Sequence, residues 1–513
     1  MVVIPALLSW LWSQISHCWN NFTVLFISLI LLALALLLDY VKRRKTCSRY
    51  PPGPTPLPFI GNLLELDTND LHNSILRLAE KFGPIFLIQL GWQNVVILNG
   101  FQVIKEALGP KAENFIDRPS LPLLSLMGHG TKCEGIFLAT CKNGWREQRR
   151  FCLSTLKNLG MGKKTLGKTV GEEAMYLSAE FKSQEGFPFD PHDLIYNAVG
   201  NIICTLTFGY RFEYHNKNYL KLMRLIEEIM KGATKILPQI MSTISWLSYI
   251  PGPQQKFKKD CHDFCTIVKE IVNEHKKNRD PIIPRDFIDA FLEEIEKAKG
   301  NPKTSFNEQN LTQILLDLFA AGSVTTASTL LWGLLAMVLH PEVQKRVHEE
   351  IDTVIGRVKL PTMEDRSNMP YTTAVIHEIQ RWADIVPVTF PYMTHKDTEV
   401  GGFVIPKETI VTTHLSAVLK DETIWAKPHE FYPEHFLDAD GQFLKREAFL
   451  PFSAGHHVCI GESLAKMEIF IFFITLMQHF TFCIPENSPR PSEKRIFALI
   501  ASPLPFQICA FPR

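Results

Sequence analysis

The segment that decides this fold is Phe452-Ser453-Ala454-Gly455-His456-His457-Val458-Cys459-Ile460-Gly461, which a helical pattern follows directly from Glu462 to Phe473. A thiol on a loop before a helix start meets free backbone N–H groups and the positive end of the helix dipole. Both effects are expected to lower its pKa and favour the thiolate, the form that binds metals. A thiolate bound axially to haem iron pushes electron density towards dioxygen and favours O–O cleavage. The pattern therefore predicts Cys459 as an axial haem ligand, with Gly455 and Gly461 letting the macrocycle approach and Phe452 shielding the sulfur.

Two other interpretations of this cysteine stay open from the residues alone. A free cysteine is commonly a small, buried core residue. His456 and His457 stand beside Cys459, and histidine and cysteine are the usual ligands of zinc. Adjacent ligands on so short a loop are geometrically awkward, however, and the sequence has no CxxC or HxxxH pair to complete a zinc site.

From Pro51 to Arg513 the sequence resembles the cytochrome P-450 superfamily of haem-thiolate monooxygenases, and within it the microsomal family 2 and its 2D-like group. Besides the cysteine loop, the resemblance is carried by Trp145-Arg-Glu-Gln-Arg-Arg150, Met369-Pro-Tyr-Thr-Thr-Ala-Val-Ile-His-Glu378 and Pro433-Glu-His-Phe-Leu437. It implies a mainly α fold with a small β-rich lobe, in which haem lies between a long central helix and the cysteine loop.

Length, composition and charge are those of a large globular protein. The chain has 513 residues, 46% of them apolar, so it can bury an extensive core. A formal net charge of +1 gives no support to nucleic-acid binding through bulk electrostatics. The 11 cysteines are irregularly spaced and do not form a disulfide framework, which favours a reducing compartment for the catalytic part.

The N-terminal 45 residues are expected to anchor the chain in a membrane. Phe22 to Leu38 is a run of 17 residues without a charge, close to the length that spans a bilayer. The basic residues follow this run, at Lys42 to Lys45, which places the C-terminal side in the cytosol. A cleaved signal peptide would carry its basic residues first. We expect an uncleaved, single-pass anchor of the endoplasmic reticulum membrane, residues 1–45.

The rest of the chain divides into a proline-rich hinge, residues 46–62, and a catalytic domain, residues 63–513. Short strands are predicted at Ile85–Leu90, at Asn94–Leu98 and within residues 390–415. Helical periodicity dominates residues 140–385. The apolar stretch Ile236 to Ile250 is either ordinary core or, as the resemblance implies, a surface that touches lipid.

A second motif, Ala320-Ala321-Gly322-Ser323-Val324-Thr325-Thr326, lies inside a long apolar helical pattern. Glycine and β-branched threonine weaken a helix locally, and a threonine hydroxyl can take a backbone carbonyl. The segment is similar to the oxygen-binding helix of the family, which implies that Ala321 lies on the haem and that Thr325 relays protons. Val324 stands where the family usually has an acid, so proton delivery would depend on water and Thr325 or on another acid.

Further cofactor and structural residues follow from the resemblance. It implies that Glu378 and Arg381, at helical i, i+3 spacing, form a buried ion pair that locks the chain near His435, which replaces the usual arginine. It also makes Trp145 and Arg149 partners of the haem propionates. His457 and Tyr392 stand where relatives carry an arginine and a histidine; since an unperturbed histidine is partly charged at pH 7, weaker or pH-sensitive haem retention is expected.

Substrate contacts are less defined. Asp317 lies two helical turns before Thr325 on an apolar stretch and is either satisfied by local hydrogen bonds or faces the pocket and attracts cationic amines. The resemblance implies that three further residues line the pocket: His129, Phe497 and Leu499.

The sequence lacks a glycine-rich dinucleotide fingerprint, so electrons must come from a partner. The family implies an NADPH-dependent flavoprotein reductase, sometimes with a small haem cytochrome. A basic concentration near the proposed haem could steer an acidic partner: Arg146, Arg149, Arg150, Lys163 and Lys164. O2 and a small lipophilic compound are the expected substrates. Two alternatives are a haem-thiolate isomerase or dehydratase that acts on peroxides, and an inactive haem-binding protein.

Overall fold

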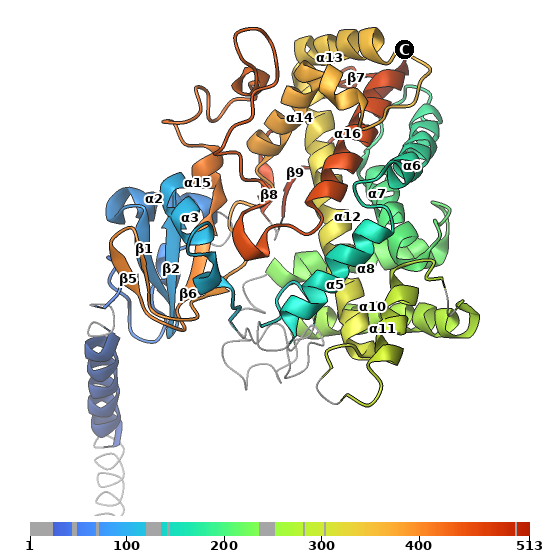
Figure 1. Cartoon of the computed structure of the whole chain (residues 1–513). Helices are drawn as coiled ribbons and strands as arrows, with labels where there is room; N and C mark the ends of the chain where they lie inside the picture. Colours follow the sequence, from blue (N-terminus) through green and yellow to red (C-terminus); the bar gives the residue numbers. More distant parts are fainter. Residues whose placement is uncertain are drawn as a thin grey trace, which may run out of the picture.

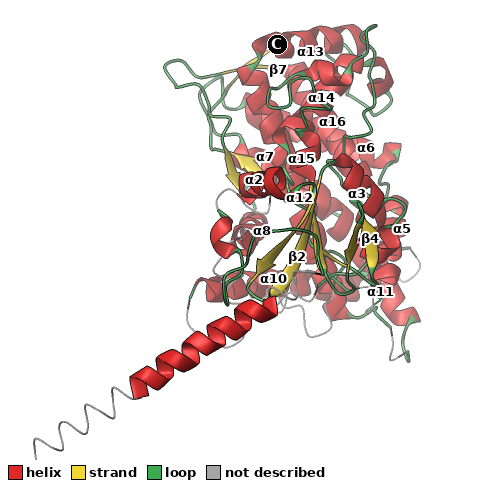
Figure 2. Cartoon of the chain, turned by 90° about the vertical axis from the view of Figure 1, so that its left-hand side faces the viewer, coloured by secondary structure: helices red, strands yellow, loops and turns green. Residues whose placement is uncertain are grey.

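The N-terminal helix stands apart from the rest of the molecule. The structure is a computed structural model that describes residues 24–43, 49–67, 71–119, 135–140, 144–234, 252–280, 283–301, 304–497 and 500–513 (Figure 1). The helix Val24–Arg43 has 20 residues with a mean hydropathy of 2.7 and projects outward (Figure 2). Its apolar side chains are exposed, as a bilayer-spanning segment requires. It runs five residues beyond the end of the predicted span.

The end of this helix is fastened to the β-rich lobe. Asp39 pairs with Arg43 at 2.6 Å and accepts a hydrogen bond from Phe59 N at 3.0 Å. Arg43 is buried and donates to Gln89 Oε1 at 2.9 Å and to Gly91 O at 2.6 Å. The two charges that mark the end of the apolar run therefore also connect the anchor to the folded part.

The β-rich lobe is built on a mixed four-stranded sheet in the order β1-β2-β6-β3. All four of its strands lie where strands are predicted: β1 Ile85–Leu90, β2 Gln93–Asn99, β6 Ile410–His414 and β3 Tyr392–Met393. Gly91 has φ +60° in the β1-β2 turn, which explains glycine there. The sheet is accompanied by α2 Leu71–Phe82, α3 Phe101–Leu108, α15 Leu415–Leu419 and the hairpin β4 Thr398–Val400 and β5 Phe403–Ile405.

The proline-rich segment packs on this lobe. Pro52 O accepts a hydrogen bond from Leu87 N at 2.9 Å. A Cβ on Gly53 would lie 2.0 Å from Leu87 O, so only glycine permits this close approach. The segment thus fixes the start of the lobe against β1.

Helices form the larger lobe, as predicted. Its members are α5 Trp145–Asn158, α6 Lys164–Lys182, α7 His192–Phe208, α8 Lys217–Thr234, α10 Pro253–Asn278, α11 Phe287–Lys297, α12 Glu308–Leu339, α13 Pro341–Val354, α14 Pro370–Ala383 and α16 Glu462–His479. The 32-residue α12 crosses the middle of this lobe (Figure 1). Most of its residues are buried on all sides, so the helix lacks a polar face.

Two local features position α12. The Asn307 side chain caps it by accepting a hydrogen bond from Asn310 N at 2.8 Å. A Cβ on Gly322 would lie 2.4 Å from Ile203 Cδ1, so glycine allows α7 to approach closely. The helix continues without a break through Thr325 and Thr326. The Thr325 hydroxyl takes the backbone carbonyl of Ala321, as predicted for a threonine in this motif.

The C-terminal segment returns to the helical lobe in four short strands, which were not predicted. They are β7 Phe480–Cys483, β8 Arg495–Phe497, β9 Ala501–Pro503 and β10 Cys509–Pro512, paired as β7-β10 and β8-β9. Ala501 O accepts hydrogen bonds from Ser328 Oγ and Trp332 Nε1, both at 3.1 Å, so β9 is fixed on α12. The apolar stretch at residues 236–250 lies outside the described residues.

Candidate haem-thiolate site

The cysteine loop lies between a short 3₁₀ turn, Gly455–His457, and the start of α16. Cys459 N donates to Phe452 O at 3.1 Å, which closes the loop. Gly455 has φ +76°, and a Cβ there would lie 2.7 Å from Leu108 O. This glycine therefore allows the loop to pack on the end of α3, and its approach to a macrocycle stays a prediction. A Cβ on Gly461 would lie 3.9 Å from Cys459 Sγ, an ordinary contact.

The Cys459 thiol is accessible to solvent although protein atoms surround it, as for a group on the wall of an internal space. Burial raises its pKa, and this effect exceeds the opposite contributions of the backbone N–H groups of Gly461 and Glu462 and of the Arg149 cation. The expected lowering of the pKa by the helix start is therefore wrong for the protein alone. A coordinated metal cation removes the thiol proton outright.

The middle of α12 also faces internal space. Ala321 is exposed and Thr325 is partly exposed, although other helices surround this part of α12. The Thr325 hydroxyl donates to Ala321 O at 2.7 Å. Both residues therefore lie on the wall of a space inside the helical lobe. Val324 is buried.

A buried arginine that the sequence did not reveal lies near the cysteine loop. Arg118 Nη1 donates to Phe390 O and Pro391 O, both at 2.8 Å, and its guanidinium lies 4.7 Å from the centre of the Tyr392 ring. Its Nε–H has no partner among the described residues. Burial lowers its pKa to about 10, so it stays charged at pH 7. Haem carries two carboxylates, and a buried cation with an open N–H suits one of them.

Trp145 and Arg149 both contact the segments around the cysteine. Trp145 Nε1 donates to Ile136 O at 2.9 Å, and its ring packs 4.4 Å from that of His457. Arg149 Nη2 donates to Val458 O at 2.5 Å. Burial lowers the Arg149 pKa, and the neighbouring Cys459 opposes this shift. The structure thus brings the predicted pair to the loop, with the Trp145 N–H already engaged by a carbonyl.

His457 is neutral. Its Nε2 hydrogen-bonds Ile116 O at 2.7 Å, which makes that nitrogen the protonated one. Burial lowers its pKa to about 3, helped by the Arg118 charge. The expected partial charge of this histidine at pH 7 is therefore wrong, and the cations of the site are Arg118 and Arg149. The Tyr392 hydroxyl lies 3.3 Å from Ser453 Oγ.

The zinc interpretation finds no support in this geometry. His457 Nε2 is taken by Ile116 O, and His456 Nε2 pairs with Glu113 at 3.0 Å. Among the described residues, one group of three metal-type ligands lies close together, and it joins α10 to α11 far along the chain from Cys459: His275, Asp286 and Asp289.

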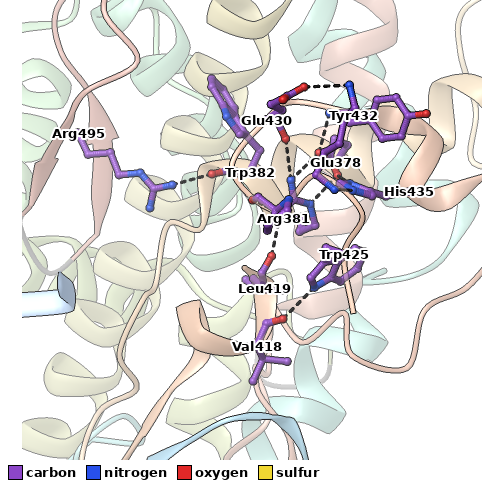
Figure 3. A network of polar contacts seen from close by, with 12 residues as sticks. Glu378, Arg381, Trp382, Val418, Leu419, Trp425, Glu430, Tyr432, His435 and Arg495 are labelled. Atoms are coloured by element: carbon purple, nitrogen blue, oxygen red, sulfur yellow. Dashed lines mark hydrogen bonds and ion pairs between the residues drawn. The ribbon is translucent and has the colours of Figure 1, made fainter. Parts of the chain in front are cut away.

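The predicted ion pair on α14 forms the centre of a buried network (Figure 3). Glu378 and Arg381 are both fully buried and bond twice, at 2.7 and 2.8 Å. Arg381 also donates to three backbone carbonyls at 2.7 to 2.8 Å, those of Leu419, Pro428 and Glu430. One side chain therefore fastens the meander of residues 419–430 to α14.

His435 completes the network as a neutral ring. Its Nε2 accepts a hydrogen bond from Lys427 N at 3.0 Å, so its Nδ1 carries the proton that Glu378 Oε2 accepts at 3.2 Å. Tyr432 N donates to Glu378 Oε1 at 2.8 Å. Histidine thus supplies one donor and one acceptor at a place where the resemblance implies an arginine.

Asp317 is buried and holds a loop. Its Oδ2 accepts hydrogen bonds from Ile136 N at 2.8 Å and Phe137 N at 3.1 Å. A Cβ on Gly135 would lie 2.4 Å from this oxygen, so glycine is required for the contact. Of the two interpretations left open, the structure supports the one with local hydrogen bonds.

We expect Asp317→Asn to weaken the attachment of this loop and to lower the affinity for charged and neutral ligands alike. The amide oxygen still accepts hydrogen bonds, but without charge, which costs about 1–2 kcal/mol. Binding titrations should show that an amine and a neutral compound of the same shape lose affinity in parallel. A loss confined to the amine would show that the carboxylate recognises ligand charge.

Glu468 on α16 is a fully buried acid without a charged partner. Neither of its oxygens has a hydrogen-bond partner among the described residues, although the Thr326 hydroxyl of α12 lies beside it. Burial raises its pKa well above the ordinary value. The carboxyl, at the junction of α12 and α16, therefore keeps its proton to a higher pH than an exposed glutamate does.

We expect Glu468→Gln to become progressively more stable than the parent as the pH rises. In the unfolded chain a glutamate loses its proton near pH 4.3, whereas the buried group keeps it. Between these two pKa values the parent loses about 1.4 kcal/mol of stability per pH unit, and the glutamine variant does not. Melting temperatures measured from pH 5 to 8 test this, with exposed Glu493→Gln as control. Parallel curves for parent and Glu468→Gln would contradict it.

The remaining predicted pocket residues are only partly described. Phe497 lies in β8, but its side chain, like the whole of His129 and Leu499, is outside the described residues.

A basic surface hollow of about 420 Å³ lies beside the cysteine loop. Its charged or titratable lining residues are Arg146, Arg149, Arg150, Lys157 and His456. Lys164, also in the predicted basic group, instead pairs with Glu364. The hollow therefore gathers most of its positive charge from α5.

Comparison with known proteins agrees with this geometry. The model of the family described as Cytochrome P450 matches residues 51–510. Cytochrome P450 2D15 of Canis lupus familiaris is 51% identical over 480 residues, which cover 93% of this chain and 96% of that protein. Cytochrome P450 2D6 of Homo sapiens is 49% identical over 489 residues, covering 95% and 98%. The chain belongs to the cytochrome P450 family, whose cofactor is haem with a cysteine thiolate as iron ligand.

Proposed function

We propose that this protein is a monooxygenase of the endoplasmic reticulum membrane that inserts one oxygen atom from O2 into small lipophilic compounds. The observation that carries the proposal is the convergence of Cys459, Arg118 and Arg149 at one loop, in a chain similar over nearly its whole length to 2D relatives. Xenobiotics, amines, fatty acids and steroids are the substrate classes that such a site would serve.

The roles of the residues follow from their positions. Cys459 would hold the haem iron through its thiolate, and bound haem would supply the chemistry of oxygen activation. Arg118 and Arg149 are the cationic partners for the propionates, with hydroxyls from Tyr392 and Ser453 nearby. Phe452 and Gly461 would border the thiolate, and Ala321 of α12 would line the haem site from the other side.

Thr325 is the proposed proton-handling residue. Its hydroxyl now donates to Ala321 O, and rotation away from that carbonyl would let it hold a water molecule. Because Val324 has no proton to give, we infer that water held by Thr325 carries protons inward, with another acid as the alternative. This arrangement supports oxygen activation over the alternative of a peroxide isomerase or dehydratase, which needs no such delivery.

The alternative of an inactive haem-binding protein rests on three departures from the pattern of the family, at His457, Tyr392 and Val324. The structure weakens it, because Arg118 supplies the permanent charge that His457 lacks. Retention of haem is then expected to depend on Arg118 and Arg149.

The anchor and the surrounding chain support a membrane-bound enzyme with its catalytic part in the cytosol. The exposed apolar helix Val24–Arg43 ends in Lys42 and Arg43, and Arg43 bonds to the folded part. Residues 1–45 as anchor, 46–62 as hinge and 63–513 as catalytic domain are the proposed divisions.

An NADPH-dependent flavoprotein reductase, with a small haem cytochrome as a second donor, is the proposed redox partner. The basic hollow on α5 lies next to the loop that carries Cys459, so an acidic partner docked there would deliver electrons over a short path. Complementary charge mainly accelerates association.

The test uses the full chain, loaded with haem, in phospholipid vesicles with the reductase. We expect NADPH-dependent O2 consumption and hydroxylated products from a panel of lipophilic compounds. Arg150→Glu should slow reduction by about tenfold or more at low salt, with the difference shrinking as salt rises. The matched control is Lys345→Glu on α13, at the other end of the helical lobe (Figure 1). Peroxide rearrangement without reductase, or the absence of O2 consumption, would overturn the proposal.

A further inference from the structure

Two cysteines face each other across the C-terminal strand pair. The antiparallel strands β7 and β10 place Cys483 directly opposite Cys509. Both are free thiols, Cys483 partly exposed and Cys509 buried. The two side chains, directly opposed in the register, lie within hydrogen-bond reach of each other.

The backbone hydrogen bonds show whether Cys483 and Cys509 form a hydrogen-bonded or a non-hydrogen-bonded pair of the antiparallel ladder. Arg513 N donates to His479 O at 2.9 Å across the strands. The N–H and the carbonyl of Phe482 point away from β10, because both bond to the Gln344 side chain, at 2.7 and 3.0 Å. Alternation along an antiparallel ladder then makes Cys483 and Cys509 a hydrogen-bonded pair, with Cα atoms about 5.5 Å apart. Disulfides span this Cα separation.

We propose that Cys483 and Cys509 form a reversible cross-strand disulfide when the protein meets a low-molecular-weight disulfide such as oxidised glutathione. Cys483, the more exposed thiol, attacks the glutathione disulfide and releases one glutathione. Cys509 then attacks the mixed disulfide and releases the second. The two protein S–H bonds and the S–S bond of oxidised glutathione are broken. One protein S–S bond and two glutathione S–H bonds form. The protein thiols are oxidised by two electrons, and glutathione disulfide is reduced by two.

The same geometry makes the bond labile. Directly opposed Cβ atoms in a sheet lie about 4.5–5.5 Å apart, whereas a relaxed disulfide needs about 3.8 Å. The strands must therefore close slightly, and strained disulfides are the readily reduced ones. Burial raises the pKa of both thiols, so oxidation is slow at neutral pH and faster at alkaline pH.

The bond would close a loop that contains β8 and β9. Because Ala501 of β9 bonds to Ser328 and Trp332 of α12, this loop connects the strand pair to the wall of the internal space. Ile508, just before Cys509, also exchanges two backbone hydrogen bonds of 3.0 Å with Phe189. Oxidation would therefore hold the C-terminal strand in place and restrict the segment between the two cysteines.

The experiment uses the full, haem-loaded protein in glutathione buffers of increasing oxidised fraction, followed by alkylation, digestion and mass spectrometry. A peptide linking Cys483 to Cys509 should appear with the oxidised fraction and disappear on return to reduced glutathione. It should be lost in Cys483→Ser and kept in the control Cys265→Ser, a partly buried thiol on α10.

A rise in melting temperature should accompany oxidation of the parent and of Cys265→Ser, and be absent in Cys483→Ser. Full alkylation of both thiols in oxidising buffer would overturn the proposal. Linkage of either residue to a different cysteine would overturn it too. If Cys483→Ser is poorly folded, Cys509→Ser provides the same comparison from the other strand.

Discussion

Cys459→Ser should abolish monooxygenase activity, with a loss of at least about 10³-fold, while leaving the protein folded. Oxygen and sulfur are similar in size, and the bond from the backbone N–H of this residue to Phe452 O is unaffected. Serine, however, cannot supply the electron donation of a thiolate. A 10³-fold loss corresponds to about 4 kcal/mol of transition-state stabilisation. Turnover with reductase and NADPH measures the effect.

A spectrum separates this outcome from misfolding. The reduced parent exposed to carbon monoxide should show the strongly red-shifted absorption of a thiolate complex, and Cys459→Ser should lack it at unchanged melting temperature. Cys265→Ser should keep both the band and the activity, because that thiol lies on α10 away from the loop. Full oxygenation by the serine variant would show that another residue holds the iron.

Short-range signals predicted the parts of the site that lie within one element. The cysteine loop and the start of α16 are adjacent in sequence, and the Glu378–Arg381 pair occupies one helix turn. The strands at residues 85–90 and 94–98 are short apolar runs around a turn that contains Gly91. The strands follow from the local sequence, whereas the burial of the Glu378–Arg381 pair is implied by the resemblance to the family and not by its spacing; the structure has both.

The predictions that are wrong or missing depend on burial and on partners that are distant in the sequence. Arg118 has no local pattern, and its importance comes only from its position beside Tyr392 and His457, hundreds of residues away. The charge state of His457 was misjudged because burial, which a sequence does not display, outweighs its unperturbed pKa. The Cys459 pKa was misjudged for the same reason. Packing between residues that are distant in the sequence determines how far a side chain is removed from water. That burial in turn determines whether the side chain is charged.

Asp317 and Gly455 illustrate a related limit. For Asp317 the sequence leaves a choice between local hydrogen bonds and a ligand, and for Gly455 it predicts an approach to the macrocycle. In the structure each residue also holds backbone: Asp317 at Ile136 and Phe137, Gly455 at Leu108. A polar residue or a glycine next to a site can serve to hold the backbone around the site and does not have to contact the ligand. Contacts distinguish the two roles, whereas residue type does not.

Arg381→Ala should lower the free energy of unfolding by about 3–5 kcal/mol and sharply reduce haem incorporation. The arginine makes five hydrogen bonds, two to Glu378 and three to carbonyls of the meander, and both charged groups are fully buried. Its loss leaves a buried carboxylate without its cation. Against a typical total stability of about 5–15 kcal/mol, this is a large fraction. Thermal unfolding and the ratio of haem to protein absorbance measure both effects.

The matched control is a surface ion pair of the same i, i+3 spacing, Lys297 with Glu294, at 2.9 Å. Since Lys297 is 58% exposed, Lys297→Ala should cost less than about 1 kcal/mol and leave haem content unchanged. Arg381→Lys should recover only part of the loss, because one ammonium cannot replace a guanidinium that reaches four groups. Equal effects of Arg381→Ala and Lys297→Ala would show that the network does not hold the meander. Normal haem loading with low stability would show that the meander is not required for the cofactor.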